Sequence, residues 1–597
     1  MSNPIIYTSD GPIRGLWQAD GIAAFHGVPF AKPPTGDLRW KSPVRPEQWK
    51  SARDATQRGP PCYQEDVVRG VGRGSEDCLY LSLYSPPQCI ANNARSSPCA
   101  VMFWVHGGAW LLGDDIGRGG GYNGSTLAML HGVIVIAVNY RLDALGWLAL
   151  REFASESPDG KGIGNFGLRD QRFGLQWAQR NVAAFGGDPD RVTLFGQSAG
   201  AFSVCQHLVS PDSNRLFSRV IMMSGACNGP WLVQPRDEYS AFGSEYASAI
   251  GCPATDDPAP RLACLRSKST ADVLLPWVDF LCSRKSSPGD PWCPDNRSAA
   301  RRSARRSSFT LAGGGSSGSP SAWPSSLARP PPLGALGLTA VVDGSSSGLP
   351  ASPLKMMRDG RINTSPSGAP LQVIMGTVED ELALFIVGVG AIFRNATVPP
   401  TAADIRIGAK QLAEYHAGWN DSTVDAITRQ YVTRLPLETN AYRLTRLGTG
   451  VVFRCATRDA ARALSAAGVS VHLYSFEFRL PKWHDPKSQR CQLLCEVGCG
   501  VYHAIDIPFA WGHIDESSEG SAALAVSKGI MSYYTNLAVT GDPNGAAGAA
   551  GVPVQWPAYD GTTDRHLAIG GDGAFRTSHG LGKQECDFWA GLPPNPW

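Results

Sequence analysis

Between residues 100 and 225 the chain alternates between two hydrophobic patterns. Residues 100–105 (AVMFWV) and 133–138 (VIVIAV) are apolar at every position, which is typical of strands buried on both faces. Residues 169–185 carry apolar side chains at helical spacing and end before the turn-forming sequence GGDPD. We therefore expect two strands and a helix at these positions.

The alternation continues with predicted strands at 191–195 and 219–225, and with a predicted helix from Ser198 to Val209 between them. Further along, the same criteria predict two strands and a helix, at residues 371–377, 470–478 and 523–538. Alternating strands and helices favour an α/β fold in which a large, mostly parallel central sheet is flanked by helices on both faces.

Residues 283–336 interrupt this order with a segment rich in Ser, Arg, Pro and Gly that has no usable apolar period. Such a composition is typical of disorder. The segment is either a long surface insertion, which costs little loop-closure entropy, or a misread stretch of the gene. We expect a single domain over residues 1–597, interrupted by this insertion.

The bulk composition describes a globular protein with a sizeable core, since 43% of the 597 residues are hydrophobic and 18% are charged. The insertion contains eight Lys and Arg and two acids, so the rest of the chain carries a formal net charge of −4. This balance does not favour a nucleic-acid partner. The longest apolar run, residues 382–393, is too short to span a bilayer.

Fifteen cysteines favour an oxidising compartment. Five N-x-S/T sequons agree with glycosylation there, at Asn123, Asn296, Asn363, Asn395 and Asn420. Residues 1–15 contain no basic stretch followed by an apolar run, so no signal peptide is visible. We expect a secreted or ER-lumenal protein with a start site further upstream, and a cytoplasmic protein is the alternative.

The sequence GQSAG at residues 196–200 fits the G-x-S-x-G pattern of a strand-to-helix turn that presents a nucleophilic serine. Small residues on either side of Ser198 are needed because the turn is sharp. Glycine and serine are also common in ordinary turns, so the pentapeptide alone leaves open whether Ser198 is a nucleophile or only a small turn residue.

A second motif precedes it. The predicted strand at 100–105 ends in His106, Gly107, Gly108 and Ala109. An HGG-type loop of this kind supplies backbone N–H donors for an oxyanion, together with the residue after the serine, Ala199. We therefore expect Gly108, Ala109 and Ala199 to form an oxyanion hole, while the ring of His106 packs behind the loop.

With both motifs in this order, the chain resembles the type-B carboxylesterases, a family that includes cholinesterases and related lipases. The resemblance covers nearly the whole chain outside the insertion. It rests on these stretches: FHGVPFAKPPTGDLRW (25–40), SEDCLYLSLYSP (75–86), NYRLDALGWL (139–148), residues 164–200, TGDPN (540–544) and CDFW (586–589). It implies the α/β-hydrolase fold.

The resemblance also implies the other members of a Ser-Glu-His triad. Three acids, Glu379, Asp380 and Glu381, stand together in MGTVEDELALF, and the residues alone do not choose among them. The family's acid falls on Glu381, which leaves Glu379 and Asp380 as solvated turn residues. The family's base falls on His503 in GVYHAIDIPFAWG, and Ser224 in MSGA resembles a supporting hydroxyl near the triad.

Next to the nucleophile, this chain has Gln197 where many relatives have glutamate. A neutral amide lacks the negative charge that would favour cationic substrates. The segment between Cys62 and Cys78 contains no tryptophan, whereas cholinesterases hold a quaternary ammonium on a tryptophan from that loop. Both features argue against a cholinesterase. Gln197 and Gly107 are expected to support the site.

The resemblance implies three disulfides, Cys62–Cys78, Cys252–Cys264 and Cys455–Cys586. Four other cysteines are expected to be buried or free thiols: Cys89, Cys99, Cys205 and Cys227. Cys491, Cys495 and Cys499 stand four residues apart just before His503. Their spacing fits no familiar zinc motif, so an extra disulfide or free thiols is the better interpretation than a metal site.

The sequence therefore predicts a serine carboxylesterase that hydrolyses small-molecule esters through an acyl-enzyme on Ser198 and needs no metal or cofactor. The alternative is a catalytically inactive adhesion or binding protein on the same fold, since a fold does not fix a function. A product of a faulty gene model is a third possibility. The substrate's acyl and alcohol groups and the oligomeric state do not follow from the sequence.

Overall fold

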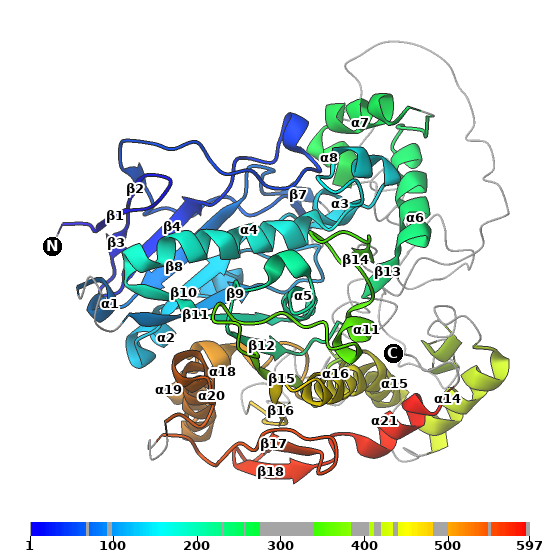
Figure 1. Ribbon diagram of the computed structural model, residues 1–597. Coiled ribbons are helices and arrows are strands. Elements are labelled where there is room, and N and C mark those ends of the chain that lie inside the picture. Colours follow the sequence, from blue (N-terminus) through cyan, green and yellow to red (C-terminus); the bar gives the residue numbers. More distant parts are fainter. Residues whose placement is uncertain are drawn as a thin grey trace.

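Eleven strands of the described residues form one large sheet (Figure 1). The computed structural model describes residues 2–66, 71–91, 98–227, 232–255, 257–274, 339–383, 405–406, 408–410, 419–433, 440–480, 500–546 and 551–592. From one edge to the other, the strands are β18 (Phe575–His579), β17 (Arg565–Ile569), β16 (Ser470–Phe476), β15 (Gln372–Val378), β12 (Arg219–Met223), β11 (Gly187–Gln197), β9 (Cys99–Val105), β10 (Ile134–Val138), β8 (Tyr80–Ser85), β4 (Ala23–Pro29) and β3 (Leu16–Trp17). The predicted insertion, 283–336, lies outside the described residues.

The strands from β17 to β10 run parallel to their neighbours. At the edges, β18 is antiparallel to β17, and β8, β4 and β3 continue the other side as antiparallel strands. The expected mostly parallel sheet is therefore confirmed. The carboxyl ends of the parallel strands all lie on the same side of the sheet, so the loops that follow these strands meet there. In open α/β sheets, ligands bind at this end of the strands.

The apolar run of β9 shows why this strand has no polar position. Val101, Phe103 and Val105 belong to the hydrophobic core on one face of the sheet, and Met102 and Trp104 belong to the core on the other face. Side chains alternate between the faces of a strand, and here helices cover both of them. Helices α4, α5 and α16 contribute to the first core, and α2, α18 and α20 to the second.

Sixteen α-helices have defined bounds among the described residues: α1 (Pro87–Ala91), α2 (Ser125–His131), α3 (Asp143–Trp147), α4 (Phe166–Asn181), α5 (Ala199–His207), α6 (Arg236–Ala249), α7 (Pro258–Ser267), α8 (Thr270–Leu274), α11 (Pro353–Arg358), α14 (Asp421–Thr433), α15 (Asn440–Gly448), α16 (Cys455–Ala466), α18 (Ile507–Trp511), α19 (Glu516–Glu519), α20 (Ser521–Thr540) and α21 (Lys583–Ala590). The predicted helices correspond to α4, α5 and α20, and the predicted strands to β9, β10, β11, β12, β15 and β16.

Short strands outside the main sheet complete the fold. β1 (Ile5–Tyr7), β2 (Pro12–Arg14) and β5 (Arg53–Asp54) form one small sheet, and β6 (Gln64–Asp66) pairs with β7 (Val71–Arg73). β13 (Val233–Pro235) pairs in parallel with β14 (Ala340–Val342), so the described chain on either side of the insertion meets at this pair.

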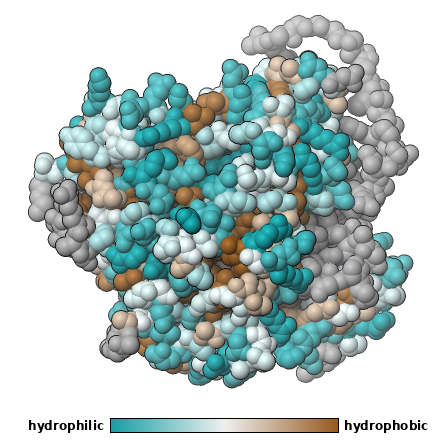
Figure 2. Space-filling view, viewed as in Figure 1, coloured by the Kyte–Doolittle hydropathy of each residue, from teal (hydrophilic) through white to brown (hydrophobic). Residues whose placement is uncertain are grey.

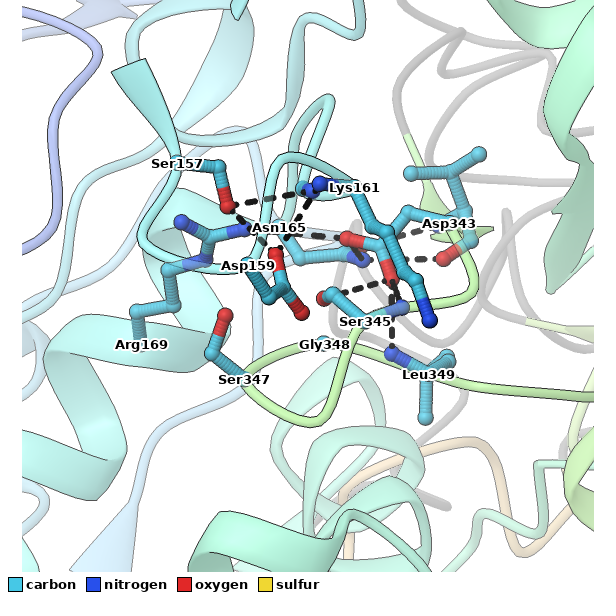
Figure 3. A network of polar contacts seen from close by, with 12 residues as sticks. Ser157, Asp159, Lys161, Asn165, Arg169, Asp343, Ser345, Ser347, Gly348 and Leu349 are labelled. Atoms are coloured by element: carbon cyan, nitrogen blue, oxygen red, sulfur yellow. Dashed lines mark hydrogen bonds and ion pairs between the residues drawn. The ribbon is translucent and has the colours of Figure 1, made fainter. Parts of the chain in front are cut away.

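A polar network holds the segment that begins at residue 339, after the insertion, against the start of α4 (Figure 3). The side-chain amide of Asn165 donates to the backbone carbonyl of Val341 at 2.8 Å and accepts from the backbone N–H of Val341 at 2.9 Å. The carboxylate of Asp343 accepts from the Asn165 amide and from the backbone N–H of Leu349, and lies 3.6 Å from the Arg169 guanidinium. Asp343 is buried, so these contacts replace the water that its charge has lost.

Five disulfides join described cysteines: Cys62–Cys78, Cys252–Cys264, Cys455–Cys586, Cys89–Cys99 and Cys205–Cys227. The first three are the pairs that the resemblance implies. The expectation of free thiols at the other four positions is wrong. The start of β9 lies beside α1, and α5 lies beside the segment after β12, which brings the paired Cα atoms to 5.9 and 5.4 Å, a separation suited to disulfides.

Cys491, Cys495 and Cys499 lie outside the described residues. Among the residues that the structure covers, no group of His, Cys, Asp and Glu has the arrangement of a metal site. Hydrophilic residues cover most of the molecular face in Figure 2. No helix in the described ranges has the length and apolar character needed to span a membrane.

Candidate active site

Ser198 is the single residue that connects β11, which ends at Gln197, to α5, which begins at Ala199. Its backbone is left-handed, with φ 57° and ψ −127°. A non-glycine residue in this strained conformation is uncommon and is held by its surroundings. A Cβ atom on Gly200 would lie 2.0 Å from the carbonyl oxygen of Val105, so the turn passes too close to β9 for any larger residue there.

His503 and Glu381 form a buried pair from two distant segments. Nδ1 of His503 lies 2.5 Å from Oε2 of Glu381, and the other carboxylate oxygen accepts a 2.9 Å hydrogen bond from the backbone N–H of Val378. The side chains are 4% and 0% exposed. The two segments run side by side because the N–H of Asp380 donates to the carbonyl of Val501. The geometry suits an oriented imidazole base.

Of the three neighbouring acids, Glu381 is therefore the one that contacts His503. Glu379 is partly exposed and forms an ion pair with Arg479 at 3.5 Å. The expectation that Asp380 is solvated is wrong, because its side chain is fully buried. Burial, together with the neighbouring charge of Glu379, raises the pKa of Asp380 to about 6.

The candidate oxyanion loop lies against Ser198. A Cβ atom on Gly107 would come within 3.1 Å of the Ser198 Cβ, and one on Gly108 within 2.0 Å of the Leu112 carbonyl oxygen. Gly108 and Ala109 both have positive φ values, 110° and 56°. This backbone needs glycine at Gly108 for space as well as for conformation.

Ala199 is the first residue of α5, where helical N–H groups have no partner within the helix and the dipole favours an anion.

His106 fills space behind this loop. Its ring stacks on Tyr140 at 4.3 Å, and Nδ1 lies 2.8 Å from the carbonyl oxygen of Gly107. Burial lowers the pKa of His106 to about 4, so the ring is neutral at physiological pH. The side chain therefore supports the loop by packing, as expected.

Ser224 and Asp506 are two further buried polar residues of this region. Ser224 follows β12, is fully buried and has a left-handed backbone with φ 52°; its hydroxyl has no hydrogen-bond partner within the described residues. Asp506, three residues after His503, accepts a 3.1 Å hydrogen bond from the Tyr474 hydroxyl. Burial, followed by the charge of Glu381, raises the pKa of Asp506 to about 7.

Sequence reasoning missed Asp506, although an acid within the apolar stretch AIDIPFAW was a usable signal.

A cavity of about 660 Å³ lies beside the loop that carries His503. Tyr502 and Ala504, the neighbours of His503 in the chain, line it together with apolar residues and four polar ones, Arg58, Asn123, His513 and Glu519. Its walls include neither Ser198 nor Gly108. The cavity therefore lies beside the His503 loop and not over Ser198.

A family model described as "Carboxylesterase family" matches residues 2–294 and 328–589. The chain belongs to the carboxylesterase family. The part of the chain between the two matched ranges falls inside the predicted insertion. As a member of this family, the protein is a carboxylic ester hydrolase with small-molecule esters as substrates.

Curated relatives of this carboxylesterase include the acetylcholinesterase of Electrophorus electricus, 28% identical over 95% of this chain and 84% of the relative. The acetylcholinesterase of Bungarus fasciatus is 29% identical over 98% of this chain and 85% of the relative. A solved structure named PNB esterase superposes with a TM-score of 0.70 at 25% identity, covering 98% of this chain and 99% of its own. The α/β-hydrolase fold is thereby confirmed.

The disulfides are typical of a protein in an oxidising compartment such as the extracellular space or the ER lumen. Of the five sequons, those at Asn123, Asn363 and Asn420 lie in the described ranges. The side-chain nitrogen of Asn363 donates to the carbonyl oxygens of His207 and Ser210 at 2.8 and 2.7 Å. Both of its hydrogens are used, so a glycan at Asn363 would break at least one of these bonds.

Proposed function

We propose that this carboxylesterase is a serine esterase in which Ser198, His503 and Glu381 form the catalytic triad. The observation that carries the proposal is the buried 2.5 Å contact between His503 and Glu381, since the other ring nitrogen of His503 lies 3.0 Å from the side chain of Gln197, the residue that precedes Ser198 in its strained turn. A serine hydroxyl is a weak nucleophile until a base accepts its proton, and the base works best when an acid orients it.

The reaction proceeds in two halves. Nε2 of His503 accepts the hydroxyl proton as Oγ of Ser198 attacks the ester carbonyl carbon, and the alcohol leaves with that proton. Water then gives a proton to His503 and attacks the acyl-enzyme, and the acid and the free Ser198 hydroxyl are released. Glu381 stabilises the imidazolium in both halves.

The negative charge of each tetrahedral intermediate is held by the backbone N–H groups of Gly108, Ala109 and Ala199. Their location against Ser198 and at the start of α5 supports this role. Fixed donors cost no reorganisation during the reaction, and removal of one typically costs about 3–4 kcal/mol of transition-state stabilisation.

Neutral esters, rather than choline esters, are the proposed substrates. Gln197 adds no negative charge beside Ser198, and the segment between Cys62 and Cys78 has no tryptophan to hold a quaternary ammonium. Acetylthiocholine and its uncharged analogue 3,3-dimethylbutyl thioacetate differ only at that group. A kcat/KM at least equal for the uncharged ester supports the proposal, whereas a strong preference for the cation contradicts it.

The decisive experiment compares hydrolysis of p-nitrophenyl butyrate by the wild-type protein and by Ser198→Ala. A triad serine contributes about 10⁴–10⁶-fold, so the variant is expected to lose activity by several orders of magnitude with an unchanged melting temperature. Ser203→Ala, within the helix that follows Ser198, is a control for the removal of a buried serine hydroxyl. Equal background rates from wild type and Ser198→Ala would instead favour the inactive binding protein.

A further inference from the structure

The side chain of Gln197 contacts Nε2 of His503, the nitrogen that accepts the proton in the proposed mechanism. Its amide Nε2 lies 3.0 Å from Nε2 of His503. Gln197 is buried, and its Oε1 lies 2.9 Å from the place that a Cβ on Gly107 would take. The amide therefore contacts the imidazole and the glycine loop at once, and its position is fixed by the turn that also presents Ser198.

We propose that Gln197 is a positioning residue that holds the resting imidazole of His503 neutral through Nε2 and releases that nitrogen to the Ser198 hydroxyl when the ester is attacked; this rests on the proposed function. An imidazole that donates from Nδ1 to Glu381 has one lone pair, on Nε2, and the Gln197 amide donates to it. The amide brings no charge, so it does not favour the imidazolium electrostatically. A carboxylate in the same place only accepts hydrogen bonds and would favour the doubly protonated ring.

Other charged groups already surround the His503 imidazole, so the absence of charge on Gln197 affects the protonation of that ring. Glu381 already faces Nδ1, and Asp506 interacts electrostatically with the ring from the segment that leads into α18. Asp380 lies beside Glu381 on the segment after β15, and Arg454 donates to a backbone carbonyl of that segment. The face of the imidazole contacts an uncharged ring, Phe453, at 5.0 Å. An additional anion at residue 197 would add to two acids that already surround the base.

The test compares Gln197→Glu with Gln197→Met, which removes the hydrogen bond without adding charge. In Gln197→Glu the acidic limb of the kcat/KM profile is expected to move upward by about one pH unit or more, since a charge at this distance shifts a titration by about that much. In Gln197→Met it is expected to move by less than half as far. Equal shifts in the two variants, or no shift in either, would overturn the proposal.

Gln88→Glu is the matched control. Gln88 is an exposed residue of α1. The disulfide Cys89–Cys99 joins α1 to the start of β9, whereas Ser198 follows the end of the neighbouring strand β11, so the two residues lie at opposite ends of the strands. This variant adds the same charge without reaching His503. Its acidic limb is expected to coincide with that of the wild type, so that a shift in Gln197→Glu alone reports the local contact.

A readout without substrate separates this proposal from the proposed function. In protein labelled with ¹³C at histidine Cε1, the His503 resonance is identified by its absence from His503→Gln. It is expected to titrate at a higher pH in Gln197→Glu than in the wild type. An inactive wild type would overturn the esterase mechanism alone, and coincident titration curves would overturn the role of Gln197 alone.

Discussion

Nδ1 of His503 lies 2.5 Å from Oε2 of Glu381, although 122 residues separate the two in the chain. The second carboxylate oxygen is held by the Val378 N–H, so the acid is fixed at both ends. A carboxylate held in this way can only accept the Nδ1 proton. It therefore selects the tautomer in which Nε2 carries the lone pair, the atom that accepts a proton when the imidazole acts as a base.

Glu381→Gln is expected to lower kcat for p-nitrophenyl butyrate by about 10²–10⁴-fold. An amide can turn its NH₂ group toward Nδ1 and so favour the wrong tautomer. Glu379→Gln, two residues away and partly exposed, is the control and is expected to remain within a few-fold of wild type. Comparable losses in both variants would show that the substitution acts on the fold of this segment and not on the base.

Asp506→Asn is expected to stabilise the protein more at pH 7.5 than at pH 5. Burial raises the pKa of Asp506 to about 7, well above that of an unfolded aspartate, about 3.9. Between these values the unfolded chain releases a proton that the folded chain keeps, so rising pH lowers the free energy of unfolding of the wild type. Well below the unfolded pKa of about 3.9 the group is protonated in both states and contributes no pH dependence.

The variant lacks this titration, so its advantage over the wild type should grow by roughly 1–3 kcal/mol from pH 5 to pH 7.5. Urea unfolding at the two pH values measures it. Asp237→Asn, an exposed position on α6, is expected to show no such growth. A constant difference for Asp506→Asn across this range would mean that Asp506 is ionised in the folded protein.

Gly108→Ala is expected to reduce kcat/KM by at least about 10²-fold. The added Cβ would lie 2.0 Å from the Leu112 carbonyl, at a backbone φ of 110° that alanine avoids, so the loop must shift away from Ser198. Gly160→Ala is the control, because Gly160 also has a positive φ, 67°, but an added Cβ there would meet no atom within 4 Å. Its activity should stay near wild type, and a similar loss there would remove the oxyanion interpretation of Gly108.

Deletion of 283–336 with a short Gly-Ser replacement is expected to leave the melting temperature within a few degrees and the esterase activity intact. The pairing of β13 with β14 and the contacts between Asn165 and Val341 hold the chain independently of the deleted residues. Differential scanning fluorimetry and p-nitrophenyl butyrate hydrolysis measure the two quantities. Loss of folding on deletion would show that the insertion is an integral part of the domain.

Asp343→Ala is expected to lower the free energy of unfolding by roughly 3–5 kcal/mol. It removes the acceptor of the Leu349 N–H and the Asn165 amide, and it leaves the buried Arg169 guanidinium without its nearest acid (Figure 3). Guanidinium unfolding provides the measurement. Asp359→Ala, an exposed acid paired with Lys355, is the control and should cost less than about 1 kcal/mol.

Much of this protein was predictable from local sequence. Runs that are apolar at every position, such as 100–105, became strands because both faces of the sheet are covered by helices. The glycines around Ser198 predicted a turn that only small residues can form. Both features depend on neighbours in the chain, so a single stretch contains the necessary information.

Tertiary structure alone decided the contacts between distant segments. The contact of Gln197 with His503 spans 306 residues, and Cys89–Cys99 and Cys205–Cys227 depend on which helix lies beside which strand. The high pKa of Asp506 likewise comes from burial that no local pattern specifies. Strands and turns follow from nearest neighbours and the periodicity of side chains, whereas hydrogen-bond partners, disulfide pairing and desolvation arise only when the folded chain brings its segments together.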